Sequence, residues 1–387
     1  MEISRRKLFY ILLAGIASKS ILDASIAAKY FSVELPFGLI ITWRAAADKY
    51  QVGMFEFVTN KWLLRKSIPL PSRAHQLTVL PDRSILITAR RPGDWLFRWW
   101  PERSQHEVQE GWLESGLQYN GHSMTVCDHR WILSSATEKI SDSGLLILHS
   151  TNTLQPVKLF DSGGKDPHDI MIHPQQPIIW VANGGVHTHP DLGRQSYSEQ
   201  ALHASIAQFD IDSIENSAAI PHFSLSNIFY LNHAWLSPRH LSFQQYSHKL
   251  GVALQCLTPR NRVCGDVPTL AIISIPASES HDQGDTADLI HYGQAEPDML
   301  GYAGDITATR SGFLLSSPRG NVISEWSLDG RLQYRITADK PCGLLSYGSG
   351  HSVVSQRNGV FHYYKGALLS ISKLHINPDN HIASFPY

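Results

Sequence analysis

The chain has 387 residues, of which 43% are hydrophobic and 17% are charged, and these fractions are ordinary for a globular protein with a large core. The formal net charge is -1, so the chain lacks the basic charge by which nucleic-acid-binding proteins hold phosphates, and nucleic acid is not an expected partner. Two residue types are abundant, with 20 histidines and 10 tryptophans. Histidine ligates metals, transfers protons and bonds backbone groups, so its abundance alone does not select a function.

The first 28 residues have the features of an export signal. A basic segment with paired Arg5 and Arg6 precedes an apolar run at residues 10–17, and small residues follow at 25–28. The arginine pair resembles a twin-arginine signal, so we expect residues 1–28 to direct the protein to the periplasm. The alternative is a basic tail beside an uncleaved anchor. No later segment has the roughly 18 uninterrupted apolar residues of a spanning helix, so we expect no integral membrane domain.

From residue 38 onward, short apolar runs rich in β-branched and aromatic residues alternate with polar turns, which is typical of strands. Seven of these apolar runs are alike, because each ends in a polar turn. They lie at residues 39–43, 85–89, 131–135, 178–182, 250–255, 313–317 and 352–355. Most of these runs are followed by a further strand. A preceding strand starts near His75, His122, His168, His240, Asp305 and Cys342. Repeats of about 40–50 residues with several strands each predict a β-propeller.

The first of the seven runs has no strand before it. Its missing partner is expected from the C-terminal segment at residues 368–384, because such a strand closes the ring and removes an open sheet edge. We therefore predict one all-β domain over residues 30–387, a seven-bladed β-propeller closed by a C-terminal strand. The alternatives are eight blades or two small β domains.

Four of the predicted first strands begin with a histidine that follows a small or turn-forming region: His75, His122, His168 and His240. In a propeller blade, the loop before the first strand and the loop between the second and third strands lie on the same face. The histidines should therefore ring one mouth of the channel. Polar residues of the other loops should surround them, namely Arg44, Arg90, Arg91, Glu138, Asn183, Arg319 and Arg357. His187 and His189 lie in an inserted loop of the same face and are expected to be solvated.

Three functions suit such a mouth. The four histidines could ligate a transition metal such as copper, iron or zinc. Histidines and arginines together could bind a small anion, such as a carboxylate or a phosphate. A metal or a histidine could also activate water to hydrolyse a lactone or an ester. The alternative is structural, because Gly121-His122 resembles the pair that ties WD40 blades together, although the tryptophan-aspartate partner is absent.

The four cysteines include no Cys-x-x-Cys pair, which excludes c-type haem attachment and zinc ribbons. Cys256 and Cys264 flank a short polar turn. They either form a disulfide in the periplasm or remain two buried thiols.

A set of motifs in this order resembles a known bacterial family. The set comprises the twin-arginine-like start, residues 89–93, Gly121-His122, Pro167-His168, residues 181–185, residues 239–241 and residues 317–321. It is similar to the family known as domain of unknown function 1513, exported proteins with a WD40/YVTN-like propeller. The residues that match the family motifs are His75, Arg90, Arg91, His122, His168, Asn183, His240 and Arg319.

The resemblance implies a periplasmic propeller and no established reaction. Because members of the family often accompany proteins of periplasmic iron handling, we expect a binding or accessory protein of metal or iron acquisition. Its partners would be periplasmic metal-uptake proteins or a small anionic ligand. The alternatives are a metal-dependent, lactonase-like hydrolase and a protein-interaction scaffold.

Overall fold

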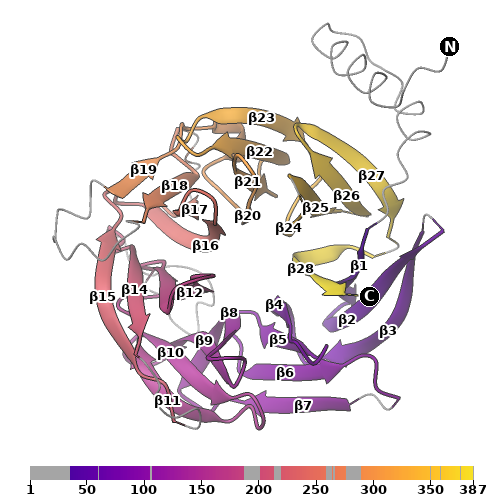
Figure 1. Ribbon diagram of the computed structural model, residues 1–387, viewed down its shortest axis with the longest axis vertical. Helices are drawn as coiled ribbons and strands as arrows, with labels where there is room; N and C mark the ends of the chain where they lie inside the picture. Colours follow the sequence, from indigo (N-terminus) through magenta and orange to yellow (C-terminus); the bar gives the residue numbers. More distant parts are fainter. Residues whose placement is uncertain are drawn as a thin grey trace, which may run out of the picture. The chain divides into compact units, whose positions relative to one another are not determined.

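The computed structural model describes residues 35–386 except 60, 105–106, 187–200, 213–218, 259–263, 265, 276–288, 349, 358 and 375. In this part of the chain the strands form seven four-stranded antiparallel sheets. The sheets are arranged as blades around a central axis (Figure 1). The prediction of a seven-bladed, all-β propeller is confirmed.

Six blades use four consecutive strands each, ordered from the axis outward. Blade 2 contains β4 (Ala74–Val79), β5 (Ile85–Ala89), β6 (Trp95–Trp100) and β7 (Glu107–Trp112). Blade 3 contains β8 (Leu117–Val126), β9 (Trp131–Glu138), β10 (Ser143–Ser150) and β11 (Pro156–Asp161). Blade 4 contains β12 (Pro167–Ile172), β13 (Ile178–Asn183), β14 (Ser205–Ile211) and β15 (Phe223–Tyr230). Blade 5 contains β16 (Leu236–Gln244), β17 (Lys249–Cys256), β18 (Leu270–Ser274) and β19 (Ile290–Tyr292). Blade 6 contains β20 (Asp305–Ala308), β21 (Gly312–Ser317), β22 (Val322–Ser327) and β23 (Leu332–Thr337). Blade 7 contains β24 (Leu344–Tyr347), β25 (His351–Gln356), β26 (Gly359–Tyr364) and β27 (Ala367–Lys373).

Blade 1 closes the ring. It consists of β28 (Pro378–Pro386), β1 (Phe37–Ala46), β2 (Lys49–Val58) and β3 (Lys61–Leu70), so its innermost strand comes from the C-terminal end (Figure 1). β28 pairs antiparallel with β1, with Ser384 opposite Leu39 and Ile382 opposite Ile41. The predicted closure is therefore confirmed, but residues 368–384 span two strands. Residues 368–373 belong to the outermost strand of blade 7, and closure falls to Pro378–Pro386 alone.

The core lies between neighbouring blades. The second strands are apolar on both faces because each face packs against an adjacent blade, and β5 and β21 are buried along their whole length. One cluster joins Ile40 and Val52 of blade 1 to Ile87 and Trp95 of blade 2. The outermost strand β23 is mostly exposed. Strands covered by neighbouring blades on both faces are therefore apolar throughout, whereas the exposed outermost strand is not.

Cys256, at the end of β17, forms a disulfide with Cys264, with an S–S distance of 1.99 Å. Of the two alternatives, the disulfide is therefore the one present. Within the described residues, no helix has the length and apolar character needed to cross a membrane.

Candidate functional site

Five histidine side chains meet on the axis of the propeller. The four predicted ones lie on β4, β8, β12 and β16, and a fifth, His381, lies on the closing strand β28. Nine of the ten pairs of rings have centroids between 4.7 and 6.0 Å apart. We call His75, His122, His168, His240 and His381 the histidine cluster.

The cluster is buried. The histidines were predicted at the start of the first strands, and they lie in the innermost strand of each blade, one to five residues after the strand begins. His75, His122 and His240 are only 6%, 2% and 4% exposed.

A local irregularity lies at each histidine. In β4, Ala74 pairs with Ala89 but Leu77 pairs with Ile87, so two residues, one of them His75, oppose a single partner. The pairing register shifts at the histidine in β8, β12, β16 and β28 as well. A β-bulge bends a strand and redirects a side chain. We infer that these bulges allow five side chains to point at one axis.

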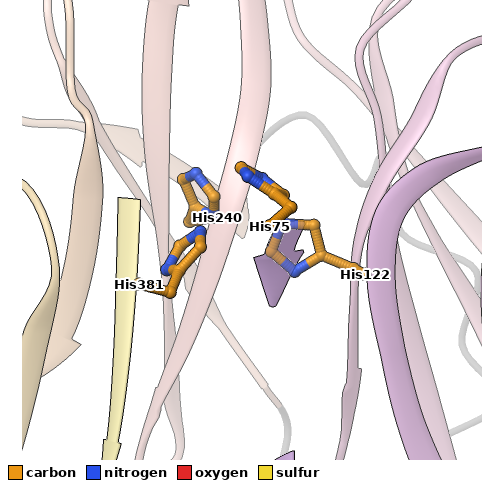
Figure 2. Close-up of side chains that lie close together, drawn as sticks. All are labelled: His75, His122, His240 and His381. Carbon is orange, nitrogen blue, oxygen red and sulfur yellow. The ribbon is translucent and has the colours of Figure 1, made fainter. Parts of the chain in front are cut away.

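Four of the five imidazoles come close to the spacing of a metal site. One ring nitrogen from each of His75, His122, His240 and His381 lies within 4.8 Å of the other three, and Figure 2 shows these rings facing one another. Four donors arranged tetrahedrally at a Zn–N distance of about 2.1 Å lie about 3.4 Å apart. Inward shifts of up to roughly 0.7 Å by each ring nitrogen would therefore complete a coordination sphere. His168 lies beside this group, 4.8 Å from His122 between ring centroids.

The ring nitrogens of the cluster are poorly satisfied. Nε2 of His122, Nδ1 of His168 and Nε2 of His381 are buried and have no hydrogen-bond partner among the described residues. Buried polar atoms are normally hydrogen-bonded, so a cluster of such nitrogens requires an explanation. A bound cation would supply one, because neutral imidazole offers it a lone pair.

Two carboxylates flank the cluster. Asp169 Oδ1 lies 2.9 Å from His122 Nδ1, and Asp305 Oδ2 lies 3.3 Å from His381 Nδ1. Carboxylates at the outer nitrogen of a ligating histidine fix the ring and raise the basicity of its inner nitrogen. In both pairs the carboxylate faces Nδ1 and leaves Nε2 as the remaining donor.

The protonation states differ within the cluster. Burial lowers the pKa of His168 and His240 well below its usual value, and the neighbouring imidazoles together with Arg239 lower it further. These two rings therefore stay neutral at pH 7. Burial also opposes the charging of His381, but the attraction of Asp305, with that of Asp169 and Asp379, outweighs burial and raises the pKa of His381. His381 must therefore release a proton before its ring nitrogen can ligate a cation.

A pocket of about 230 Å³ opens onto the cluster. Its wall includes His75, His168 and His240, and its other polar lining comes mainly from the loops of the same face. The expectation that the loops before the first strands and those after the second strands share one face is confirmed. The cationic side chains that line the pocket are Arg73, Arg90, Arg91, Arg239 and Lys340.

Three charged residues beside the pocket are ion-paired in the interior. Asp166 contacts Arg91 through Oδ1 and accepts a 3.0 Å hydrogen bond from Arg239 through Oδ2. All three are at least nine-tenths buried. Burial lowers the pKa of Arg239 to about 10, so the guanidinium still carries its charge at neutral pH. Two cations therefore share one anion.

The structure brings some predicted site residues to the pocket and not others. Arg90 and Arg91 line it, as do three of the predicted histidines. Glu138 is outside the lining and accepts a hydrogen bond from Ser141. Asn183 is fully buried and donates to Ser162 O at 2.9 Å, so its amide is used in packing. Arg319 is also outside the lining and lies over the Tyr302 ring, 4.1 Å from its centroid. His187 and His189 lie outside the described residues.

The sequence interpretation missed His381, Arg73, Arg239 and Lys340. A signal for His381 was present, because Asn380-His381-Ile382 lies in the segment predicted to close the ring and resembles the other histidine phrases. Arg239 directly precedes His240 and belongs to the same bulge. Arg73 and Lys340 lie in loops that carry no recurring pattern.

Comparisons with known proteins support the fold. The sequence family described as "Protein of unknown function (DUF1513)" matches residues 68–385. No curated protein matches the chain. A functionally unknown protein from Desulfotomaculum acetoxidans is similar in structure, with a TM-score of 0.56 and 11% identity over 90% of this chain and 98% of that one.

Two other solved structures are similar to the same degree. A candidate 6-phosphogluconolactonase from Bacteroides uniformis has a TM-score of 0.58 and 14% identity, over 90% of this chain and 99% of that one. Hydrazine synthase of Kuenenia stuttgartiensis has a TM-score of 0.57 and 12% identity, over 87% of this chain and 97% of that one. At such identities the likeness establishes the propeller fold alone.

Proposed function

The chain belongs to the DUF1513 family of proteins of unknown function, and from the geometry of its site we propose that it is a periplasmic protein that binds a transition-metal ion at the histidine cluster. One observation carries the proposal. Four histidines from four different blades bring nitrogen donors within 4.8 Å of one another in a buried site. Histidines that only stabilised their blades would be expected to bond to those blades, yet several of these ring nitrogens have no partner among the described residues.

The donor set restricts the metal. Imidazole nitrogen suits copper, iron and zinc, whereas magnesium and calcium prefer oxygen ligands. The four-histidine group contains no thiolate, and its carboxylates contact the outer ring nitrogens. Among these metals, iron is favoured by the family resemblance, because members of that family often accompany proteins of periplasmic iron handling. On this view the partners would be periplasmic metal-uptake proteins.

The pocket favours binding over hydrolysis. A hydrolase needs a general base within reach of the attacking water. Asp379, which lines the pocket, is paired with Arg73 at 2.6 Å, and Asp166 beside it is shared by two arginines. Neither carboxylate is available as a base, and the described lining contains no other carboxylate. The histidines of the lining are the remaining candidate bases, and on this proposal they belong to the metal site.

The metal content of the purified protein tests the proposal. The protein would be isolated from its native periplasm without a polyhistidine tag and analysed by plasma mass spectrometry. We expect copper, iron or zinc at close to one ion per chain. The double variant His122→Ala/His240→Ala should lose at least nine-tenths of it and keep the circular dichroism spectrum of the native protein.

A surface histidine provides the matched control. His222 is 59% exposed in its side chain, and its contacts with described residues, to Asp212, Ser224 and Phe160, all lie outside the cluster. The variant His222→Ala should retain the metal. A native protein without metal, or a folded double variant that keeps it, would show that the histidine cluster is not a metal site.

A further inference from the structure

We propose that the pocket above the histidine cluster binds a small anion with several oxygen acceptors, of the di- or tricarboxylate or inorganic phosphate class. The anion would bind next to the proposed metal ion, and the presence of that ion rests on the proposed function. The positive charges of the pocket provide its independent support.

The pocket has an excess of cationic side chains. Five of its lining residues are arginine or lysine, whereas the carboxylates that line or contact it are Asp379 and Asp166. The cationic side chains of the lining thus outnumber these carboxylates by five to two. Clefts lined by charges of one sign concentrate counter-ions, so the pocket attracts anions.

Two of these cations have no ion pair in the described chain. Arg90 and Lys340 both line the pocket, and neither makes a side-chain hydrogen bond or salt bridge with a described residue. The side chain of Arg90 is half-buried, so packing holds it at the pocket. In addition, Nε of Arg239 is buried and has no acceptor among the described residues. Unused donors on buried or half-buried guanidinium groups are available to an anion.

The chemistry of these donors indicates which anion fits. The planar fork of a guanidinium matches the two oxygens of a carboxylate or phosphate and binds them with charge-assisted hydrogen bonds. The pocket volume of about 230 Å³ is below the roughly 300 Å³ at which sites for drug-sized ligands begin. The volume therefore favours a small ligand over a peptide, and the cationic lining favours an anion over a neutral sugar.

The pocket also places its ligand beside the candidate metal donors. His75 and His240 belong both to the four-histidine group and to the pocket wall. An anion held by the arginines therefore lies next to the metal site and can neutralise the charge of both. The arrangement is that of a receptor for a metal and an anion together.

Isothermal titration calorimetry tests the inference on the full protein. Inorganic phosphate and succinate would be titrated separately into metal-loaded protein, with glycerol as the uncharged comparison. We expect saturable binding of one or both anions and none of glycerol, and the tighter anion identifies the class. Arg90→Gln should weaken that binding at least tenfold and leave the metal content unchanged.

The control and the variants separate the two proposals. Arg65→Gln removes a surface arginine that pairs with Glu56 on the outer strands of blade 1, and it should leave anion affinity unchanged. If metal-loaded protein binds neither anion, or if Arg65→Gln weakens binding as much as Arg90→Gln, the pocket is not an anion site and the metal proposal stands. If the protein holds no metal but binds an anion through Arg90, the metal proposal fails and the anion pocket stands.

Discussion

At the scale of single residues, Gly121 shapes the histidine cluster. Its φ is +115°, a conformation that glycine adopts readily and other residues avoid. A Cβ atom there would lie 2.4 Å from Cδ2 of His75. Gly121 thus permits both the bulge that carries His122 and the position of the neighbouring imidazole. The resemblance to the Gly-His pair of WD40 blades is therefore only part of its role, because this glycine also leaves room for a candidate ligand.

We expect Gly121→Ala to lower stability and to weaken metal binding. Gly116→Ala is the matched control, since Gly116 has a φ of +112° but open space around its Cβ position. Backbone strain of this kind costs on the order of 1–3 kcal/mol, and both variants should show it in urea unfolding. Only Gly121→Ala should also lose metal affinity. Equal metal affinity in the two variants would mean that the His75 ring moves aside freely.

At the scale of elements, two aspartates connect the innermost strands. Asp169 on β12 accepts a hydrogen bond from Leu241 N on β16, and Asp305 on β20 accepts one from Leu344 N on β24, at 2.8 and 2.9 Å. Each also accepts from the amide of the residue that follows it. The same carboxylates contact His122 and His381. Asp169 therefore joins two strands that carry the cluster, and Asp305 joins the innermost strands of the two blades that do not.

The variant Asp305→Ala should reveal both roles. It leaves two buried backbone amides without an acceptor, and each such loss costs about 1–3 kcal/mol. It also removes the charge that raises the pKa of His381, and loss of such an orienting group typically weakens metal affinity by 10- to 100-fold. Chemical denaturation and competitive metal titration measure the two effects. Asp339→Ala removes an exposed aspartate paired with Arg357 and should change neither quantity by much.

The sequence predicted elements better than it predicted the orientation of side chains. The second strands were recognisable because burial on both faces demands continuous apolar runs, as in residues 85–89 and 313–317. The direction of the histidines depends on bulges, and a shift of one residue in register reverses which face a side chain occupies. Asn183 and Glu138 lie at strand ends much as Arg90 follows one, yet only Arg90 reaches the pocket. Such differences depend on loop conformations that a short polar turn does not encode.

At the scale of the whole molecule, β28 links closure of the ring to completion of the site. It supplies the innermost strand of blade 1, and it carries His381 as well as Asp379, the partner of Arg73. Ile382, Ala383 and Phe385 are buried against the adjoining blades. The proposed metal site is therefore incomplete until the C-terminal strand has paired with β1.

Truncation before Pro378 and the point variant His381→Ala distinguish these two contributions. The truncation exposes the edge of β1 and the apolar surface that Ile382 and Phe385 cover. Burial of each of these two side chains contributes about 1.5–3 kcal/mol to the free energy of unfolding. We expect it to lower the melting temperature sharply, to promote self-association through the free strand edge and to abolish metal binding. His381→Ala keeps the strand pairing, so it should remain a monodisperse folded protein that binds metal weakly. The readouts are scanning calorimetry, light scattering and metal content.

A truncated chain that melts like the native protein would mean that the ring does not depend on β28. Full metal content in His381→Ala would instead move the fourth donor to His168, whose ring adjoins those of His75, His122 and His240.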